Sequence, residues 1–269
     1  MDRAAQILRD NREFYRACAP AYDAGREYSF RREGVRVRAD LEWLNAHLAL
    51  DKATVLDIGC GTGFYSLMAA TLGVREVHCL DIDPVFLKAA SEKVLSAYPQ
   101  VQLHCHEGDL ESFARTRAEL LLDTDIYIMG SVLQYVPGYQ AILQEMASRV
   151  QCGGFYITST RLPGNGRHRL VDGFLARLDY ALHRLIHPRS RGQRSLPATK
   201  VTLEVDPEGL KQLFEKHGFA TKFYSYSAFH TLAIDSVHRW LRAMFPALGT
   251  HFTLLAVKMS TGDIPSKKR

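Results

Sequence analysis

The chain of 269 residues is long enough for one α/β domain with a lid, or for two small domains at most. Its composition, 46% apolar and 23% charged with a net charge of +5, is that of an ordinary globular protein. No run of about 18 apolar residues occurs, so we expect no membrane span. The first five residues lack the apolar core of a secretory signal.

The cysteines also bear on the compartment. They are scattered, odd in number, and form no Cys-x-x-Cys pair, and two of them fall in predicted strands. We therefore expect buried, reduced thiols, a cytoplasmic protein and no metal site. The five are Cys18, Cys60, Cys79, Cys105 and Cys152.

Residues 1–50 are predicted to form an N-terminal helical lid. Residues 1–20 have a helical pattern with mixed charge, and a second helix is expected from Gly34 to Leu50. The polar, arginine-rich segment between them contains Tyr22 and Tyr28.

A glycine-rich turn follows the first predicted strand. The run Val55-Leu56-Asp57-Ile58-Gly59-Cys60-Gly61-Thr62-Gly63 precedes a helical pattern, which indicates a strand, a tight loop and a helix. The dinucleotide fingerprint requires a third small residue where this chain has Phe64. A carboxylate at Asp57 would repel a pyrophosphate but suits the ammonium group of an amino-acid ligand.

This motif resembles the first motif of the class I S-adenosylmethionine-dependent methyltransferases, small-molecule type. The resemblance covers about residues 50–160 and 205–260. It implies a Rossmann-like α/β fold, with a seven-stranded, mostly parallel sheet whose last strand is antiparallel and helices on both faces. It also implies S-adenosylmethionine as the cofactor, bound at Asp57, Gly59, Cys60, Gly61 and Gly63.

The other expected cofactor contacts follow the next three strands. Asp81 ends a strand over 76–81, where a carboxylate can accept both ribose hydroxyl hydrogens, and Ile82 would cover one face of the adenine. The resemblance implies that Asp109 reads the adenine amino group with Leu110 beside the ring. Ligands of such sheets bind beyond the carboxyl ends of the strands, which brings in Met129 and Gly130. The family also places a lid tyrosine near the cofactor carboxylate; Tyr22 and Tyr28 match by position, although packing of the lid explains them equally.

Two histidines alternate along the strand predicted over 101–106. A pair of metal ligands is one interpretation of His104 and His106, and solvated or hydrogen-bonded strand histidines are the other. Asp83 is predicted to cap the helix that begins at Pro84.

The rest of the core is predicted from the same signals. A strand over 125–131, a helix over 139–150 and a strand over 155–159 complete a cofactor-binding core at 51–160. The core resumes over 206–260, where Asp206 should cap a helix beginning at Pro207 and Gly218 should end it. Strands over 220–226 and 252–258 close the sheet.

Two insertions and a tail are particular to this chain. Residues 161–205 are predicted to form a basic helical insertion, because the sequence over 161–200 has nine arginines and lysines and only two aspartates. A solvated face, a site for an anionic acceptor, and a surface for nucleic acid or an anionic membrane all fit this charge. A helical insertion at 230–249 is apolar and partly aromatic, which suits an apolar acceptor. Residues 261–269 are expected to be a disordered tail.

The predicted reaction is methyl transfer by in-line displacement to an oxygen or nitrogen of a small molecule. An alcohol or phenol acceptor benefits from a general base, for which His230, His168 and Tyr135 are the candidates, whereas an amine needs only its lone pair. The alternatives are an aminopropyl transferase, a module that binds the cofactor without turnover, and methylation of a carrier-bound or nucleic-acid acceptor. The partner is predicted to be a small-molecule acceptor, without nucleic acid, and the protein a monomer or homodimer.

Overall fold

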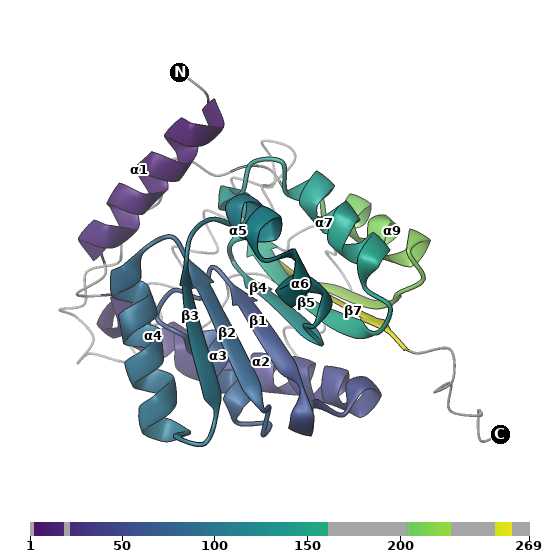
Figure 1. The fold of residues 1–269 in the computed structure, drawn as a ribbon, viewed down its shortest axis with the longest axis horizontal. Coiled ribbons are helices and arrows are strands. Elements are labelled where there is room, and N and C mark those ends of the chain that lie inside the picture. The colour runs from purple at the N-terminus through teal and green to yellow at the C-terminus, as the bar shows by residue number, and fades with distance from the viewer. Residues whose placement is uncertain (1–2, 19–21, 161–202, 204, 227–250, 260–269) are drawn as a thin grey trace.

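The computed structural model describes residues 3–18, 22–160, 203, 205–226 and 251–259 (Figure 1). Within them a seven-stranded sheet has the order β3-β2-β1-β4-β5-β7-β6. Strand β7 is antiparallel to both of its neighbours, and the other pairings are parallel. The strands are β1 (Thr54–Ile58), β2 (Glu76–Asp81), β3 (Gln102–Glu107), β4 (Ile126–Gly130), β5 (Gly153–Thr160), β6 (Ala220–Tyr226) and β7 (His251–Lys258). The Rossmann-like fold expected from the resemblance is confirmed.

Helices cover both faces of this sheet (Figure 1). One face packs on α2, α3 and α4, and the other on α5, α6, α7, α9 and the short 3-10 helix η3. The helices are α1 (Arg3–Cys18), α2 (Tyr22–Leu48), η2 (Leu50–Lys52), α3 (Phe64–Ala70), α4 (Pro84–Ala97), α5 (Leu110–Thr116), α6 (Ala118–Leu122), η3 (Leu133–Tyr135), α7 (Tyr139–Arg149) and α9 (Pro207–Lys216). None of these described helices is long and apolar enough to cross a lipid bilayer.

The central strand β1 is buried on both faces of the sheet. All five residues of β1 are buried because the strand is central and covered on both faces. Alternate residues enter different cores: Val55 packs in the core beneath α2, α3 and α4, whereas Leu56 packs in the core beneath α5 and α7. This two-sided burial fixes the register of the strands and therefore the position of the loops at their carboxyl ends.

Two helix starts were predicted from capping residues, with different outcomes. Asp83 caps α4 as predicted, and its side chain accepts a hydrogen bond from the backbone N–H of Val85 at 2.9 Å. Asp206 occupies the N-cap position of α9, but its side chain makes no capping hydrogen bond, so that part of the prediction is wrong. Pro207 still begins the helix, with the backbone angle that its ring imposes.

The second helix begins 12 positions earlier than predicted, at Tyr22 instead of Gly34. The sequence of its first half has no apolar stripe, but two described polar side chains there contact other elements. Asp23 accepts a hydrogen bond from Thr62 at 2.5 Å and forms an ion pair with Lys93 at 2.6 Å. Glu33 accepts a hydrogen bond from Tyr65 at 2.9 Å. Tertiary partners therefore extend α2 beyond its periodic pattern.

The prediction that the cysteines are buried holds for only two of the four that are described. Cys60 and Cys79 are buried, whereas Cys105 and Cys152 are exposed. Cys105 lies on β3, an edge strand that neighbouring elements cover less completely than the central strands. The predicted insertions at 161–205 and 230–249 and the tail at 261–269 lie outside the described residues, apart from residues 203 and 205.

Candidate functional site

The glycine loop, residues 59–63, joins β1 to α3 at the carboxyl edge of the sheet. Gly59, Gly61 and Gly63 have φ angles of 67°, 53° and 77°, which favour glycine. A Cβ on Gly59 would lie 2.4 Å from Val132, and one on Gly63 would lie 2.8 Å from Ala90. A Cβ on Gly61 would meet nothing within 4 Å. Gly59 and Gly63 thus allow close packing, whereas Gly61 borders open space that a ligand can enter.

Asp81 holds the glycine loop to the end of β2. One oxygen of its carboxylate accepts a hydrogen bond from the Gly61 N–H at 2.9 Å, and the other accepts one from the Asp83 N–H at 3.0 Å. Burial raises the pKa of Asp81, and the two N–H groups act in the opposite direction by stabilising the charged form. Each carboxylate oxygen has two lone pairs, so both can accept a further hydrogen bond from a ligand hydroxyl.

Asp57, at the end of β1, has an unusual environment. Its side chain is fully buried, and Oδ2 accepts a hydrogen bond from the Ser66 hydroxyl at 2.6 Å. Oδ1 has no hydrogen-bond partner among the described residues. Burial raises the pKa of this carboxyl to about 7. A buried acceptor without a donor is costly, and a cationic or hydrogen-bonding ligand group would supply what is missing.

The remaining predicted cofactor residues lie at the same edge but in different roles. Asp109 caps α5, where its carboxylate accepts hydrogen bonds from the Ser112 N–H at 2.8 Å and the Ser112 hydroxyl at 2.9 Å. The side chains of Leu110 and Met129 are buried in the hydrophobic core beneath α5 and α7. Gly130 is required by packing, since a Cβ there would lie 1.9 Å from the Tyr65 ring. Ile82 is partly buried directly after β2.

Helix α1 lies across this edge of the sheet, beside the end at which β3 leads into α5 (Figure 1). Arg16 forms an ion pair with the buried Asp83 at 3.2 Å, and Arg12 forms one with Glu107 at 2.7 Å. The Tyr15 ring lies 5.7 Å from the Tyr135 ring in an edge-to-face arrangement. Sequence reasoning did not single out these α1 residues, because their significance comes from partners more than 60 positions away.

Aromatic rings join α1, α2 and α4 at this edge. Tyr22 lies 5.3 Å from Phe86 and 6.3 Å from Tyr15, measured between ring centroids. Tyr22 therefore packs between α1 and α4, and its contact with the cofactor stays a prediction. Tyr28 lies within α2, and its side chain is outside the described set.

Of the three candidate general bases, the structure describes only one. Tyr135 is in η3, at the carboxyl edge of the sheet, whereas His168 and His230 lie outside the described residues. The sequence analysis missed His251, which begins β7 and pairs with Thr160 at the end of β5. Its position beside the carboxyl end of β5 depends on the antiparallel pairing of β7, which periodicity alone does not reveal.

A polar network beneath the ends of β5 and β7 was also missed. Arg36 donates a hydrogen bond to Thr253 at 2.7 Å and pairs with Glu33 at 3.0 Å. Glu33 in turn accepts from Tyr65, the ring that covers Gly130. The network therefore holds the Tyr65 ring in place beside the carboxyl end of β4.

Comparison with known proteins agrees with this geometry. The methyltransferase domain family matches residues 55–154. A ribosomal protein L11 methyltransferase of Prochlorococcus marinus is 34% identical over 122 residues, covering 45% of this chain and 40% of that protein. A ubiquinone biosynthesis O-methyltransferase of Xanthomonas campestris is 33% identical over 120 residues, covering 45% and 48%. The chain thus spans less than half the length of these curated relatives.

A solved structure extends the likeness of the fold over most of the chain. Magnesium protoporphyrin IX methyltransferase from Synechocystis PCC 6803, with bound SAH, superposes with a TM-score of 0.52 at 17% identity. The superposition covers 84% of this chain and 83% of that one. At this identity the likeness shows the fold alone.

Proposed function

Residues 55–154 form a class I S-adenosylmethionine-dependent methyltransferase domain, and from this premise we propose that the protein methylates an oxygen or nitrogen of a small, partly apolar or anionic molecule. The observation that carries the proposal is the arrangement of three groups at one edge of the sheet. Gly61 borders open space, and the Asp81 carboxylate bound to its N–H can accept further hydrogen bonds. One buried oxygen of Asp57 has no donor among the residues that the structure describes.

Each of these groups suits a different part of S-adenosylmethionine. Asp81 would accept the ribose hydroxyl hydrogens while keeping its hydrogen bonds to Gly61 and Asp83. Gly61 would allow the ligand close to the backbone. Asp57 would face the ammonium group, whose positive charge compensates the buried carboxylate.

The adenine would lie between Ile82 and the start of α5. Asp109 would accept a hydrogen bond from the adenine amino group in addition to those from Ser112, since each carboxylate oxygen has two lone pairs. Leu110 would pack beneath the ring from the core.

The protein contributes alignment above all. When bound, S-adenosylmethionine supplies a methyl group on a sulfonium with a neutral thioether as leaving group. Holding an acceptor at attack distance can remove about 7–11 kcal/mol from the barrier. A base adds about 10²–10⁴-fold for a hydroxyl acceptor, and we propose His230, His168 and Tyr135 for this role.

Two observations bear on the acceptor. One relative is named for O-methylation in ubiquinone biosynthesis, which supports a small-molecule acceptor, and the basic segment over 161–200 suits an anionic one. The relatives named for ribosomal protein L11 support a second candidate, a protein acceptor. The scattered cysteines, four of them described and free, support a reducing compartment such as the cytoplasm.

Binding of S-adenosylmethionine to Asp81→Ala tests the cofactor site. Hydrogen bonds to charged groups contribute about 1.5–3 kcal/mol each, so the dissociation constant should rise at least about tenfold. Isothermal titration calorimetry on the full chain measures this. Asp51→Ala is the matched control, because Asp51 is exposed and precedes β1 at the opposite edge of the sheet.

Equal affinity in the wild type and in a folded Asp81→Ala variant would refute the cofactor site. Turnover separates an enzyme from a module that only binds the cofactor. Incubation with labelled S-adenosylmethionine should release S-adenosylhomocysteine in the presence of either a metabolite extract or purified L11, and the active arm identifies the acceptor class. Tight binding without release in both arms would contradict the proposed transfer.

A further inference from the structure

Four polar side chains gather on β2 and β3, away from the glycine loop. Glu76 and His78 lie two residues apart on β2, and His104 and His106 lie two residues apart on β3. His78 is directly opposite His104, so all four project from the same face. The His106 ring contacts Phe113 at 5.2 Å between centroids, which shows that this face is the one covered by α5.

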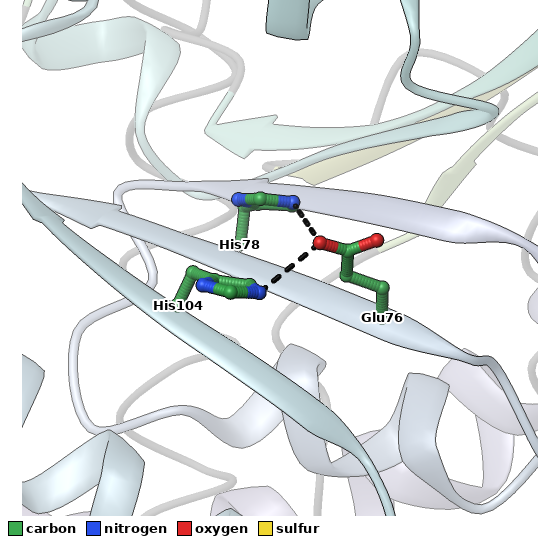
Figure 2. Close-up of side chains that lie close together, drawn as sticks. All are labelled: Glu76, His78 and His104. Carbon is green, nitrogen blue, oxygen red and sulfur yellow. Dashed lines mark hydrogen bonds and ion pairs between the residues drawn. The ribbon is translucent and has the colours of Figure 1, made fainter.

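Three of these side chains converge on one point (Figure 2). The Glu76 Oε1 atom lies 3.1 Å from His78 Nε2 and 3.1 Å from His104 Nε2. All three atoms lie within 4.8 Å of one another. The two imidazole rings are stacked, with centroids 4.8 Å apart and planes 16° from parallel, so both nitrogens point toward the carboxylate.

We propose that Glu76, His78 and His104 bind a divalent transition metal of the zinc class. Two imidazole nitrogens and one carboxylate oxygen are a ligand set that zinc uses, at bond lengths of about 2.0–2.2 Å. Tetrahedral ligands at such lengths lie roughly 3.3 Å from one another, close to the 3.1 Å between the Glu76 oxygen and each histidine nitrogen. Binding would also require the two stacked rings to rotate so that both nitrogen lone pairs point at the ion. All three ligands lie on the paired strands β2 and β3 and none on a loop, so the backbone holds their positions.

The fourth side chain supports the first histidine. His78 Nδ1 lies 2.9 Å from His106 Nε2, so the ring nitrogen that does not face the metal has a hydrogen-bond partner. Metal-binding histidines usually have such a partner, which fixes the tautomer and the ring orientation.

The surrounding charges and exposure are compatible with a bound cation. Arg75 lies 3.6 Å from Glu76 Oε2, the oxygen that does not face the histidines, and Arg117 is the nearby cation on the His106 side. The Glu76 and His104 side chains are 21% and 48% exposed, which leaves access for the ion and for a water as fourth ligand. The carboxylate and the two imidazole nitrogens supply donor atoms for a transition-metal cation, and the two arginine charges oppose its binding.

The location indicates a structural role. His78 precedes Asp81 by three residues on β2, so roughly 10 Å separates the proposed metal site from Asp81. The ligands come from an edge strand and its neighbour, so the ion would clamp β3 to β2. This inference does not depend on the proposed methyl transfer.

Zinc titration of the untagged full chain by calorimetry tests the site. We expect one zinc per chain with a micromolar or lower dissociation constant, and cobalt substitution should give the visible absorption of a four- or five-coordinate ion. Glu76→Gln and His104→Ala should each weaken zinc binding at least tenfold, and His106→Ala should weaken it less. His217→Ala is the matched control, because this histidine lies at the end of α9 and should leave zinc binding unchanged.

Absence of stoichiometric zinc binding would overturn the inference and leave a hydrogen-bonded cluster only. Undiminished binding in both Glu76→Gln and His104→Ala would overturn it equally. Should the variants fail to fold, imidazole ¹⁵N spectra of the unmodified chain decide: zinc must shift the His78 and His104 signals, and a shift confined to other histidines contradicts the site.

Discussion

The glycine loop and helix α1 lie at the same edge of the sheet and are held there by different forces. The loop is fixed by backbone groups: Gly59 and Cys60 donate to the Leu80 carbonyl at 2.7 and 3.1 Å, and Gly61 donates to Asp81. Helix α1 is fixed by side chains, namely two ion pairs and the edges of aromatic rings. The Arg16 side chain is 57% exposed and that of Arg12 is 44% exposed, so water and salt weaken both ion pairs.

The difference teaches which part of the site is rigid. Backbone hydrogen bonds in a buried loop persist as long as the sheet is folded, whereas exposed ion pairs contribute little to stability. We therefore expect the loop to keep its conformation when α1 moves. Substitutions in the loop should have large effects on stability or cofactor binding, and substitutions on α1 should have small ones.

The largest expected effect is on stability, and it distinguishes the packed Gly63 from Gly61, which borders open space. Gly63→Ala would force a left-handed residue against the Ala90 Cα and Cβ at 2.9 and 2.8 Å. Strain and overpacking together should lower the free energy of unfolding by about 2–5 kcal/mol. Gly61→Ala has free space and should cost only about 1 kcal/mol, from its backbone angle. Urea unfolding of both variants measures the difference.

For cofactor affinity we expect the opposite order, with Gly61→Ala more affected than a folded Gly63→Ala variant. Gly61→Ala places its methyl group in the space proposed for the ligand, so S-adenosylmethionine binding should weaken by at least about tenfold. If Gly61→Ala bound the cofactor as well as the wild type, the open space beside the loop would not be the ligand site.

A medium effect is expected from Asp57, through pH. Its folded-state pKa of about 7 exceeds the ordinary 3.8, so the folded protein binds the extra proton between these values. The contribution of Asp57 to the free energy of unfolding therefore falls as pH rises from about 4 to 7. The full loss is about 4 kcal/mol at most, at about 1.4 kcal/mol per pKa unit. Asp57→Asn should lack this decline.

Urea unfolding of the wild type and Asp57→Asn at pH 4.5, 6 and 7.5 tests this contribution. Asp40, whose pKa burial also raises, titrates in both proteins and cancels in the difference. Asp81 repels the Asp57 carboxylate, so the difference reports the two carboxyls together. Parallel pH profiles for the two proteins would mean that the Asp57 carboxyl is ionised throughout, and that Oδ1, which has no donor among the described residues, receives one in solution.

The smallest effects are expected on α1. Arg16→Ala removes the partner of the buried Asp83 carboxylate and should cost up to about 1 kcal/mol, whereas Arg12→Ala breaks an exposed pair and should cost about 0.5 kcal/mol or less. Thermal unfolding at low and high salt measures both. If either arginine variant lost more stability than Gly63→Ala, the expectation that α1 contributes less to stability than the glycine loop would be wrong.

The parts of the site that the sequence predicted are those with local causes. The spacing of Gly59, Gly61 and Gly63 predicted a tight loop, and Asp83 followed by Pro84 predicted the start of α4; both are confirmed. The first half of α2 was missed because Asp23 and Glu33 find their partners on other elements. Side-chain roles for Tyr28, His168 and His230 stay predictions.

Strand β3 marks the limit of sequence reasoning. Its alternation placed His104 and His106 on one face, but no pattern could pair His78 with His104 across two strands. The sequence by itself determined the order of strands and helices, because hydrophobic periodicity, glycine angles and capping residues act within a few positions. Only the tertiary structure decided the Glu76–His78–His104 cluster, the Asp57 oxygen that has no partner in the described part of the chain, and the place of α1. These depend on which distant side chains the parallel register brings within hydrogen-bond distance.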